Sequence, residues 1–239
     1  MKHSIRNSIP NLLTTLNIVS GFIGIIFILR FNQPMMGILF MFIAAFFDLI
    51  DGLSARLLKA ASDIGKELDS LCDIVSFGVL PGILMFDFLC GFTSGFTGIG
   101  RFIPFISLLI PAFTALRLAI FNTNEQSLKT FNGLSCPIAA SIFAAIVLNS
   151  HTMPILQSMS PTWAICIITA LILLLCFLMI SKVRFLTMKF KTFSWKENNL
   201  TYIFAVTVTI LLIAFGYDAI LYGLILYIIF SLIFANRLS

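Results

Sequence analysis

Long apolar runs alternate along the chain with short polar breaks that contain charged residues, glycine or proline. A hydrocarbon core of about 30 Å is crossed by ~20 apolar residues in a helix, and eight of the runs approach or exceed this length. The pattern therefore predicts eight membrane helices. They cover residues 12–29, 34–58, 67–89, 102–122, 134–149, 162–180, 200–215 and 219–235.

The runs are continuous and lack the period-two alternation of a barrel wall, so the pattern predicts an all-α, polytopic helix bundle. Composition agrees, because 59% of the residues are apolar and only 10% are charged, which is too little polar surface for a water-soluble globule. Small residues four apart, at Ser20 and Gly24 and at Gly78 and Gly82, allow close helix packing in lipid. We therefore expect the first and third helices at the centre of the bundle.

The positive charges lie mostly on one side of the predicted membrane. The net charge of +5 alone would allow a nucleic-acid partner. With the N-terminus in the cytoplasm, however, only Arg30 and Arg101 of the 15 lysines and arginines fall on the outer side. This positive-inside bias predicts two cytoplasmic termini and no nucleic-acid partner. The basic segment 182–196 suits anionic lipid headgroups, although topology alone also explains it.

Acidic residues are concentrated in one short stretch. The chain has ten, and six of them lie between Asp48 and Asp73, across the end of the second predicted helix and the start of the third. Even the lenient insertion scale assigns a charge at the bilayer centre a cost of ~2.5 to 3.5 kcal/mol. Carboxylates within membrane helices therefore indicate a functional site.

Helical spacing places these acids on facing sides of the two helices. At about 100° per residue, one set of residues shares one side of each helix. On the second helix the set is Asp48, Asp51, Gly52, Ala55 and Arg56. On the third helix it is Gly65, Asp69, Asp73 and Ser76. A short connection makes the helices antiparallel, so we expect four carboxylates to meet near the cytoplasmic boundary.

Clustered carboxylates repel one another unless a cation neutralises them. All-oxygen ligands favour Mg²⁺ or Mn²⁺ over zinc and are compatible with Ca²⁺. Two such ions could clamp a pyrophosphate, and one carboxylate would remain as a general base. Gly52 would let a ligand approach the backbone, Gly65 lies where helix N–H groups favour anions, and Arg56 is either a phosphate ligand or an interface anchor.

One stretch resembles the signature of the CDP-alcohol phosphotransferases: Asp48-x-x-Asp51-Gly52-x-x-Ala55-Arg56, eight residues, then Gly65-x-x-x-Asp69-x-x-x-Asp73. Eight specified positions at fixed separations make this match specific. Within that family the chain is most similar to the membrane-integral (type II) phosphatidylserine synthases. Four further stretches carry this similarity, at residues 9–14, 73–78, 117–122 and 131–137.

The resemblance implies a single membrane domain over residues 1–239 with the signature at 48–73; the last two helices, about 200–235, match only in hydrophobicity. It implies an enzyme of the cell (inner) membrane with its active site near the cytoplasmic face. Such an enzyme transfers the phosphatidyl group of CDP-diacylglycerol to L-serine, releases CMP and uses Mg²⁺ or Mn²⁺, with two ions expected. Homodimers occur in the family, so the resemblance allows one here.

The resemblance also assigns roles to individual residues. Metal ligands would be Asp48, Asp51 and Asp69, and Asp73 would ligate metal or take the proton of the serine hydroxyl. The nucleotide and pyrophosphate would lie against Asn11, Thr14, Gly52, Ala55, Arg56 and Gly65. The acceptor would meet Ser76 and Arg117; alternatively, Ser76 bonds back to its own helix and Arg117 only anchors a helix end at the interface.

Two positions depart from the family pattern and bear on the acceptor. Ile120 replaces a second arginine, and Ser135 replaces a proline. The acceptor could therefore be glycerol 3-phosphate or inositol phosphate, although a phosphate should require more basic residues than Arg117 and Lys129. A cation transporter is the remaining alternative. It is disfavoured because the acids cluster at one membrane boundary and the chain shows no internal repeat.

Overall fold

A computed structural model describes residues 2–58, 60, 62–123, 131–150, 158–185, 223 and 226. Within these residues the chain is almost entirely helical. Five helical segments are long and apolar enough to cross a membrane, and the helix Cys136–Asn149 is shorter. An all-α membrane bundle is thereby confirmed. The helices predicted at 200–215 and 219–235 lie outside the described residues except for positions 223 and 226, so the total of eight stays a prediction.

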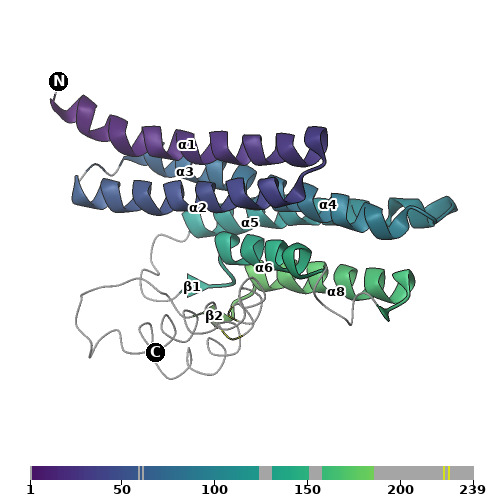
Figure 1. Cartoon of the computed structure of the whole chain (residues 1–239). Coiled ribbons are helices and arrows are strands. Elements are labelled where there is room, and N and C mark those ends of the chain that lie inside the picture. Colours follow the sequence, from purple (N-terminus) through teal and green to yellow (C-terminus); the bar gives the residue numbers. More distant parts are fainter. Residues whose placement is uncertain are drawn as a thin grey trace.

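The described elements follow one another as a series of helices with two very short strands (Figure 1). In chain order they are α1 Lys2–Phe31, α2 Pro34–Leu57, α3 Asp63–Ile74, η1 Val75–Val79, α4 Leu80–Thr93, η2 Gly98–Leu108, α5 Leu109–Thr123, β1 Phe131–Asn132, α6 Cys136–Asn149, α8 Pro161–Ile180 and β2 Arg184–Phe185. α3, the π-helical η1 and α4 form one continuous segment, and the 3₁₀-helical η2 continues into α5. The strands β1 and β2 pair antiparallel, a small departure from the all-helical prediction.

The helices pack side by side with their long directions roughly aligned (Figure 1). α1 and α2 lie on one side of the bundle, α6 and α8 lie on the other, and α4 and α5 lie between them. α1 begins at the end of the bundle where α2 ends and α3 begins. We call this the carboxylate end, because the parts of α2 and α3 nearest to it carry Asp48, Asp51, Asp69 and Asp73.

Helix boundaries follow local sequence signals. Proline occupies the first turn of α2, α6 and α8, where its missing N–H and its fixed φ are tolerated. α3 has Ser62 as its N-cap, and the Ser62 hydroxyl accepts a hydrogen bond from the Gly65 N–H at 3.1 Å. Capping of this kind satisfies a backbone donor that the helix itself leaves unpaired. The third helix therefore begins at Asp63, earlier than the predicted start at residue 67.

The first helix turns its polar side inward. Thr14, Asn17 and Ser20 are buried. Apolar residues on the opposite side are exposed, namely Leu12, Leu16, Val19, Phe22, Ile26 and Leu29. In lipid this exposure carries no hydrophobic penalty, and polar side chains between helices can hydrogen-bond across the interface. α1 therefore presents donors and acceptors to the helices that carry the carboxylates.

Small residues bring the helices into close contact. A Cβ added at Gly24 would lie 3.1 Å from the Gly37 carbonyl oxygen of α2. A Cβ added at Gly78 would lie 3.2 Å from the Cα of Pro111 in α5, and one at Gly82 would lie 3.0 Å from the Cδ of the same proline. α1 and the α3–η1–α4 segment each pack against several other elements. The α3–η1–α4 segment is central, as the small residues predict, whereas α1 lies on one side of the described bundle, so the predicted central position of the first helix is wrong.

The connection before α6 is tied to the end of α8. The Gly133 N–H donates to the Val183 carbonyl oxygen at 2.8 Å, and the Leu134 N–H donates to the Leu178 carbonyl oxygen at 3.0 Å. Gly133 has a φ of +80°, and a Cβ there would collide with the Met179 carbonyl oxygen. Glycine is therefore the residue that this position accepts without strain.

We predict that Gly133→Ala lowers the midpoint of thermal unfolding in detergent. The alanine must strain the backbone, at a cost of about 1–3 kcal/mol, or displace the end of α8. Gly91→Ala is the matched control, because a Cβ at Gly91 meets no atom within 4 Å and alanine favours a helix. This control should unfold at the wild-type temperature or slightly above it, and equal midpoints for the two variants would contradict the prediction.

Candidate metal and substrate site

Three carboxylates from two helices meet at the carboxylate end of the bundle. One oxygen from each of Asp48, Asp51 and Asp69 lies within 4.8 Å of the others. Asp51 is buried, and the other two are partly buried. The structure thus brings together side chains of α2 and α3 that helical spacing placed on facing sides.

The fourth carboxylate, Asp73, lies about one turn further along α3 and is not part of this group of three. Its side chain is buried, and its Oδ1 accepts a hydrogen bond from Asn17 Nδ2 of α1 at 3.3 Å. Three of the four aspartates therefore have oxygens close enough to share one ion, and Asp73 lies near enough to interact with all three while it accepts its own hydrogen bond from α1. Helical spacing does not reveal this difference, because Asp69 and Asp73 share one side of α3.

The side chains that donate to these carboxylates are neutral. Thr14 Oγ1 donates to Asp51 Oδ2 at 2.6 Å. Asp69 Oδ1 is buried and has no hydrogen-bond partner among the described residues. Buried polar atoms are nearly always satisfied, and three clustered carboxylates with an unpartnered oxygen form a hard, all-oxygen donor set. The residues present therefore fit a divalent cation such as Mg²⁺ or Mn²⁺.

A hollow of about 210 Å³ opens beside the three carboxylates. Five of the residues expected at a nucleotide line it, namely Asn11, Thr14, Gly52, Ala55 and Gly65. The other lining residues are Pro10, Asp51, Ala60, Ser62, Lys66 and Asp69. Arg56, the sixth residue expected there, is exposed in the last turn of α2 and does not line the hollow. The positive charge of the described lining comes from Lys66.

The two glycines of this hollow have different surroundings. A Cβ added at Gly52 would meet no atom within 4 Å, so a side chain there would fill space that a ligand can use. A Cβ added at Gly65 would lie 3.0 Å from Ser62 Oγ and 3.3 Å from Asn11 Oδ1. Gly65 does lie in the first turn of α3, as the sequence predicts, but its own N–H donates to the capping hydroxyl of Ser62.

The two residues expected at the acceptor, Ser76 and Arg117, are both buried. Ser76 Oγ donates to the backbone carbonyl oxygen of Asn17 at 3.2 Å, so it bonds across to α1 and not back to its own helix. Arg117 Nη1 donates to Cys136 Sγ at 3.4 Å, and Arg117 Nε is buried without a partner among the described residues. Burial argues against a simple interface anchor, whose charged group would remain in water.

A π-helical turn, η1, follows α3 directly after Ile74. Such turns insert a residue into the helix, change the direction of the side chains that follow, and are frequent at functional sites. η1 carries Ser76, and a Cβ added at Gly21 of α1 would lie 2.6 Å from Ser76 Oγ. Glycine at residue 21 therefore permits the close approach of α1 and η1, which keeps Asn17 beside Asp73.

The two departures from the family pattern lie outside the hollow. Ile120 is 47% exposed, so a side chain at this position of α5 points outward, whereas Arg117 on the same helix points inward. Ser135 is the N-cap of α6 and makes no capping hydrogen bond with its side chain. Lys129, the other basic residue considered for the acceptor, lies outside the described residues.

Asn17, Lys66 and Cys136 contact the site although the sequence pattern did not assign them to it. A signal for Asn17 was present, because it belongs to a set of polar residues at three-residue spacing inside an apolar run. Lys66 lies within the signature, but a lysine at a membrane boundary is ordinarily an anchor. Cys136 carried no signal, because its contact with Arg117 joins two separate helices.

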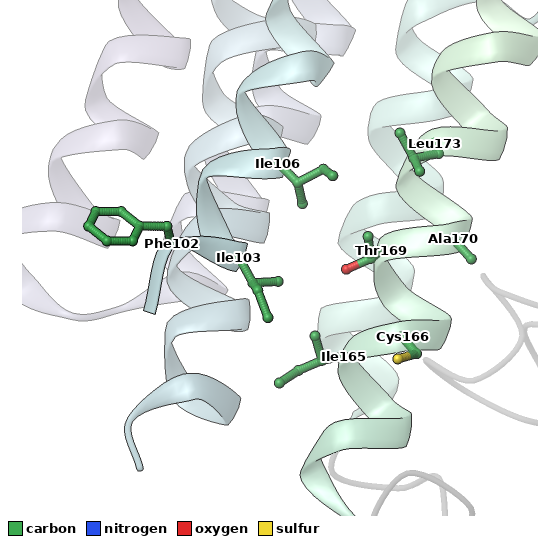
Figure 2. A pocket seen from close by; sticks show the side chains of 8 residues that line it. All are labelled: Phe102, Ile103, Ile106, Ile165, Cys166, Thr169, Ala170 and Leu173. Atoms are coloured by element: carbon green, nitrogen blue, oxygen red, sulfur yellow. The ribbon is translucent and has the colours of Figure 1, made fainter. Parts of the chain in front are cut away.

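A second and larger hollow, of about 530 Å³, lies between η2 and α8. Figure 2 shows side chains of η2 and α8 directed toward each other, with Ile103 and Ile106 across from Ile165 and Thr169. The full lining consists of Phe102, Ile103, Ile106, Ile165, Cys166, Thr169, Ala170 and Leu173. None of these side chains is charged, so this hollow suits hydrocarbon and not a nucleotide.

Known proteins resemble this chain over most of its described part. A family model described as CDP-alcohol phosphatidyltransferase matches residues 7–154. A CDP-diacylglycerol–serine O-phosphatidyltransferase of Bacillus subtilis is 34% identical over 179 residues, which are 75% of this chain and 90% of that protein. A protein of the same name from Helicobacter pylori (strain 26695) is 31% identical over 78% of this chain and 74% of its own length. An archaetidylserine synthase of Methanothermobacter thermautotrophicus is 35% identical over 59% of this chain and 58% of its own length.

We predict that Asp51→Asn weakens Mn²⁺ binding by more than about tenfold, since even the loss of an outer-shell partner of a metal ligand typically has that effect. Electron paramagnetic resonance of free Mn²⁺ in titrations of the purified protein measures the affinity. Asp87→Asn is the control, because Asp87 lies on α4 outside the group of three. Wild-type affinity in Asp51→Asn would remove Asp51 from the metal site.

Proposed function

Because this chain belongs to the CDP-alcohol phosphatidyltransferase family, we propose that it is a CDP-diacylglycerol–serine O-phosphatidyltransferase. The family consists of membrane enzymes that transfer a phosphatidyl group. The observation that carries the proposal is the convergence of Asp48, Asp51 and Asp69 beside a hollow, with Asp73 nearby. Relatives named as serine phosphatidyltransferases supply the acceptor.

In the proposed reaction the hydroxyl oxygen of L-serine attacks the phosphorus that bears the lipid. A new P–O bond to serine forms, the bond from that phosphorus to the bridging oxygen breaks, and CMP leaves. Asp73 takes the hydroxyl proton as the general base. Asn17 Nδ2 donates to Asp73 Oδ1, so one oxygen is oriented and the other stays available for the proton.

The residues that would hold metal are Asp48, Asp51 and Asp69, with Mg²⁺ or Mn²⁺ as the ion and two ions proposed from the family resemblance. Such ions, when bound, would neutralise negative charge on the pyrophosphate and on the departing CMP. The chain itself provides the hollow for the nucleotide. There Gly52 leaves space against the backbone of α2, and Lys66 brings a positive charge to the lining. We retain Arg56 as a second cation for the pyrophosphate.

Serine is favoured as the acceptor by the charge of the surrounding groups. Arg117 is buried and can bind a carboxylate with its planar guanidinium. The described polar neighbours on that side, Asn17, Ser76 and Cys136, carry no full positive charge. One arginine balances the single carboxylate of a net-neutral amino acid, whereas glycerol 3-phosphate or inositol phosphate would bring about two negative charges. The relative named archaetidylserine synthase has a different lipid in its name but the same acceptor, serine.

We further propose eight membrane helices with both termini in the cytoplasm, and an active site near the cytoplasmic face of the cell (inner) membrane. The positive-inside distribution of lysine and arginine supports this orientation. Asp48, Asp51 and Asp69 lie in parts of α2 and α3 next to their connecting turn, so the nucleotide would enter from that side. The polar headgroup of CDP-diacylglycerol and water-soluble serine can both reach such a site without crossing the bilayer.

The acceptor assignment is tested with purified protein in detergent, CDP-diacylglycerol, Mn²⁺ or Mg²⁺ and radiolabelled L-serine. We expect labelled phospholipid and stoichiometric release of CMP, and neither product from Asp69→Asn. Parallel reactions contain radiolabelled glycerol 3-phosphate. Labelled lipid from glycerol 3-phosphate and none from serine would overturn the serine assignment and leave the family membership intact.

The role of Asp73 is tested by Asp73→Asn, which keeps the size of the side chain and removes its basicity. Loss of a general base should lower turnover by roughly 10²–10⁴-fold, while binding of CDP stays close to that of the wild type. Calorimetric titration with CDP in the presence of Mn²⁺ measures this binding. A parallel loss of CDP and Mn²⁺ binding would show that Asp73 acts chiefly as a metal ligand.

A further inference from the structure

Two buried polar atoms, on two helices that both pack against α3 and η1, lack hydrogen-bond partners among the described residues, and they are of opposite kinds. One is Asn17 Oδ1, an acceptor on a side chain that is fully buried. The other is Arg117 Nε, a donor on a side chain that is 9% exposed. Buried polar atoms without partners are rare in folded proteins, and each one calls for an explanation. A ligand with both an acceptor and a donor would explain the pair.

The orientation of the Asn17 amide follows from its neighbour. An ionised carboxylate only accepts hydrogen bonds, so the amide nitrogen must face Asp73, and it lies 3.3 Å from Oδ1 of that residue. The amide oxygen must then point elsewhere. A ligand that brings its hydroxyl to Asp73 consequently comes close to Asn17 Oδ1, which has no hydrogen-bond partner among the described residues.

The position of Asn17 is held by contacts between two helices. Its backbone carbonyl oxygen accepts the hydrogen bond from Ser76 Oγ at 3.2 Å. The neighbouring turn of α1 approaches η1 so closely that a Cβ at Gly21 would lie 3.2 Å from the Ser76 Cα. Asn17 therefore cannot withdraw from Asp73 without separation of α1 from η1, and its side chain is preorganised for a ligand.

Arg117 reaches the same part of the bundle from α5. Its Nη1 donates to Cys136 Sγ at 3.4 Å. The guanidinium is thus fixed at one nitrogen while Nε remains uncommitted. On either side of Arg117, α5 packs against α3 and η1: Asn122 Nδ2 donates to Ser70 Oγ at 2.9 Å, and a Cβ added at Gly78 would lie 3.1 Å from Thr114 Cβ. The helices that pack against the Asp73 end of α3 thus carry an uncommitted acceptor on α1 and an uncommitted donor on α5.

We propose that Asn17 Oδ1 accepts a hydrogen bond from the ammonium group of an α-amino acid acceptor whose carboxylate is bound by Arg117. The proposal rests on the proposed function and extends it, because it makes Asn17 the residue that selects for an amino group. A zwitterion satisfies both uncommitted atoms at once. An acceptor alcohol with a carboxylate and no amine leaves Asn17 Oδ1 buried and unpaired, which is the kind of penalty that gives polar sites their selectivity.

The test compares L-serine with 3-hydroxypropanoate, which has the carboxylate and the hydroxyl of serine but no ammonium group. The full-length protein in detergent, with CDP-diacylglycerol and Mn²⁺, is used to measure KM and kcat for L-serine and the competitive inhibition constant of 3-hydroxypropanoate. Asn17→Leu should raise KM for serine at least about tenfold, the minimum expected for a lost hydrogen bond to a charged group. The inhibition constant should change by less than about threefold, because that ligand never made the bond.

Two variants separate this role from others. Thr14→Val removes a neutral hydrogen bond from α1 to Asp51, so it should lower kcat and leave the ratio of the serine KM to the 3-hydroxypropanoate inhibition constant unchanged. Arg117→Ala should raise both constants together, because both ligands have a carboxylate. A role of Asn17 limited to positioning Asp73 would reduce kcat in Asn17→Leu without changing the ratio, and that result would overturn the proposal.

Asn17→Asp keeps an oxygen in the place of Oδ1 and decides the question where Asn17→Leu does not yield folded protein. Its kcat should fall, because a second carboxylate then lies beside Asp73, but the preference for serine over 3-hydroxypropanoate should equal or exceed that of the wild type. A lost preference with the oxygen still present would refute the proposal. The wild type serves as the check on the premise: if it forms no lipid from serine, the proposed function itself is wrong, whatever the variants do.

Discussion

Four carboxylates at one end of this membrane bundle determine which side chains the surrounding helices turn inward. An unpaired charge inside a membrane is costly, so the elements around the four aspartates must turn polar or small residues toward them. α1 does so with Thr14 and Asn17, which donate to Asp51 and Asp73. The apolar side of α1 is left to face lipid, where it needs no protein partner. The inward polar side of α1 is therefore a consequence of the acids on α2 and α3.

The two aspartates of α3 have different chemical neighbourhoods. Asp69 belongs with the carboxylates of α2 and with the hollow proposed for the nucleotide. Asp73, about one turn later, accepts a hydrogen bond from Asn17 and lies where α5 packs against α3 and η1. The pyrophosphate of the donor would thus approach α3 at Asp69, and the hydroxyl of the acceptor would approach it at Asp73. The π-helical turn after Asp73 and the glycine at residue 21 keep α1 close enough to form the second neighbourhood.

Much of the bundle could be predicted from the sequence, because hydrophobic runs, proline at helix starts and small residues at fixed spacing are local signals. The central position of the third helix and the convergence of Asp48, Asp51 and Asp69 followed from spacing alone. Three details did not follow. Ser62 uses the N–H of Gly65, Arg56 lies outside the described hollow, and Ser76 bonds to another helix. Each detail depends on which of several possible partners a polar side chain contacts. The helical periodicity of the sequence does not specify that partner.

Hydrophobicity, charge and helical spacing are properties of each segment, so the sequence alone predicted a membrane bundle with a carboxylate site on two helices. The burial of Arg117 and the hydrogen bond from Asn17 to Asp73 emerged only from the packing of the helices. The Asn17–Asp73 hydrogen bond joins residues 56 positions apart. Such contacts arise from the packing of α1, η1 and α5 against one another, and no single segment specifies that packing.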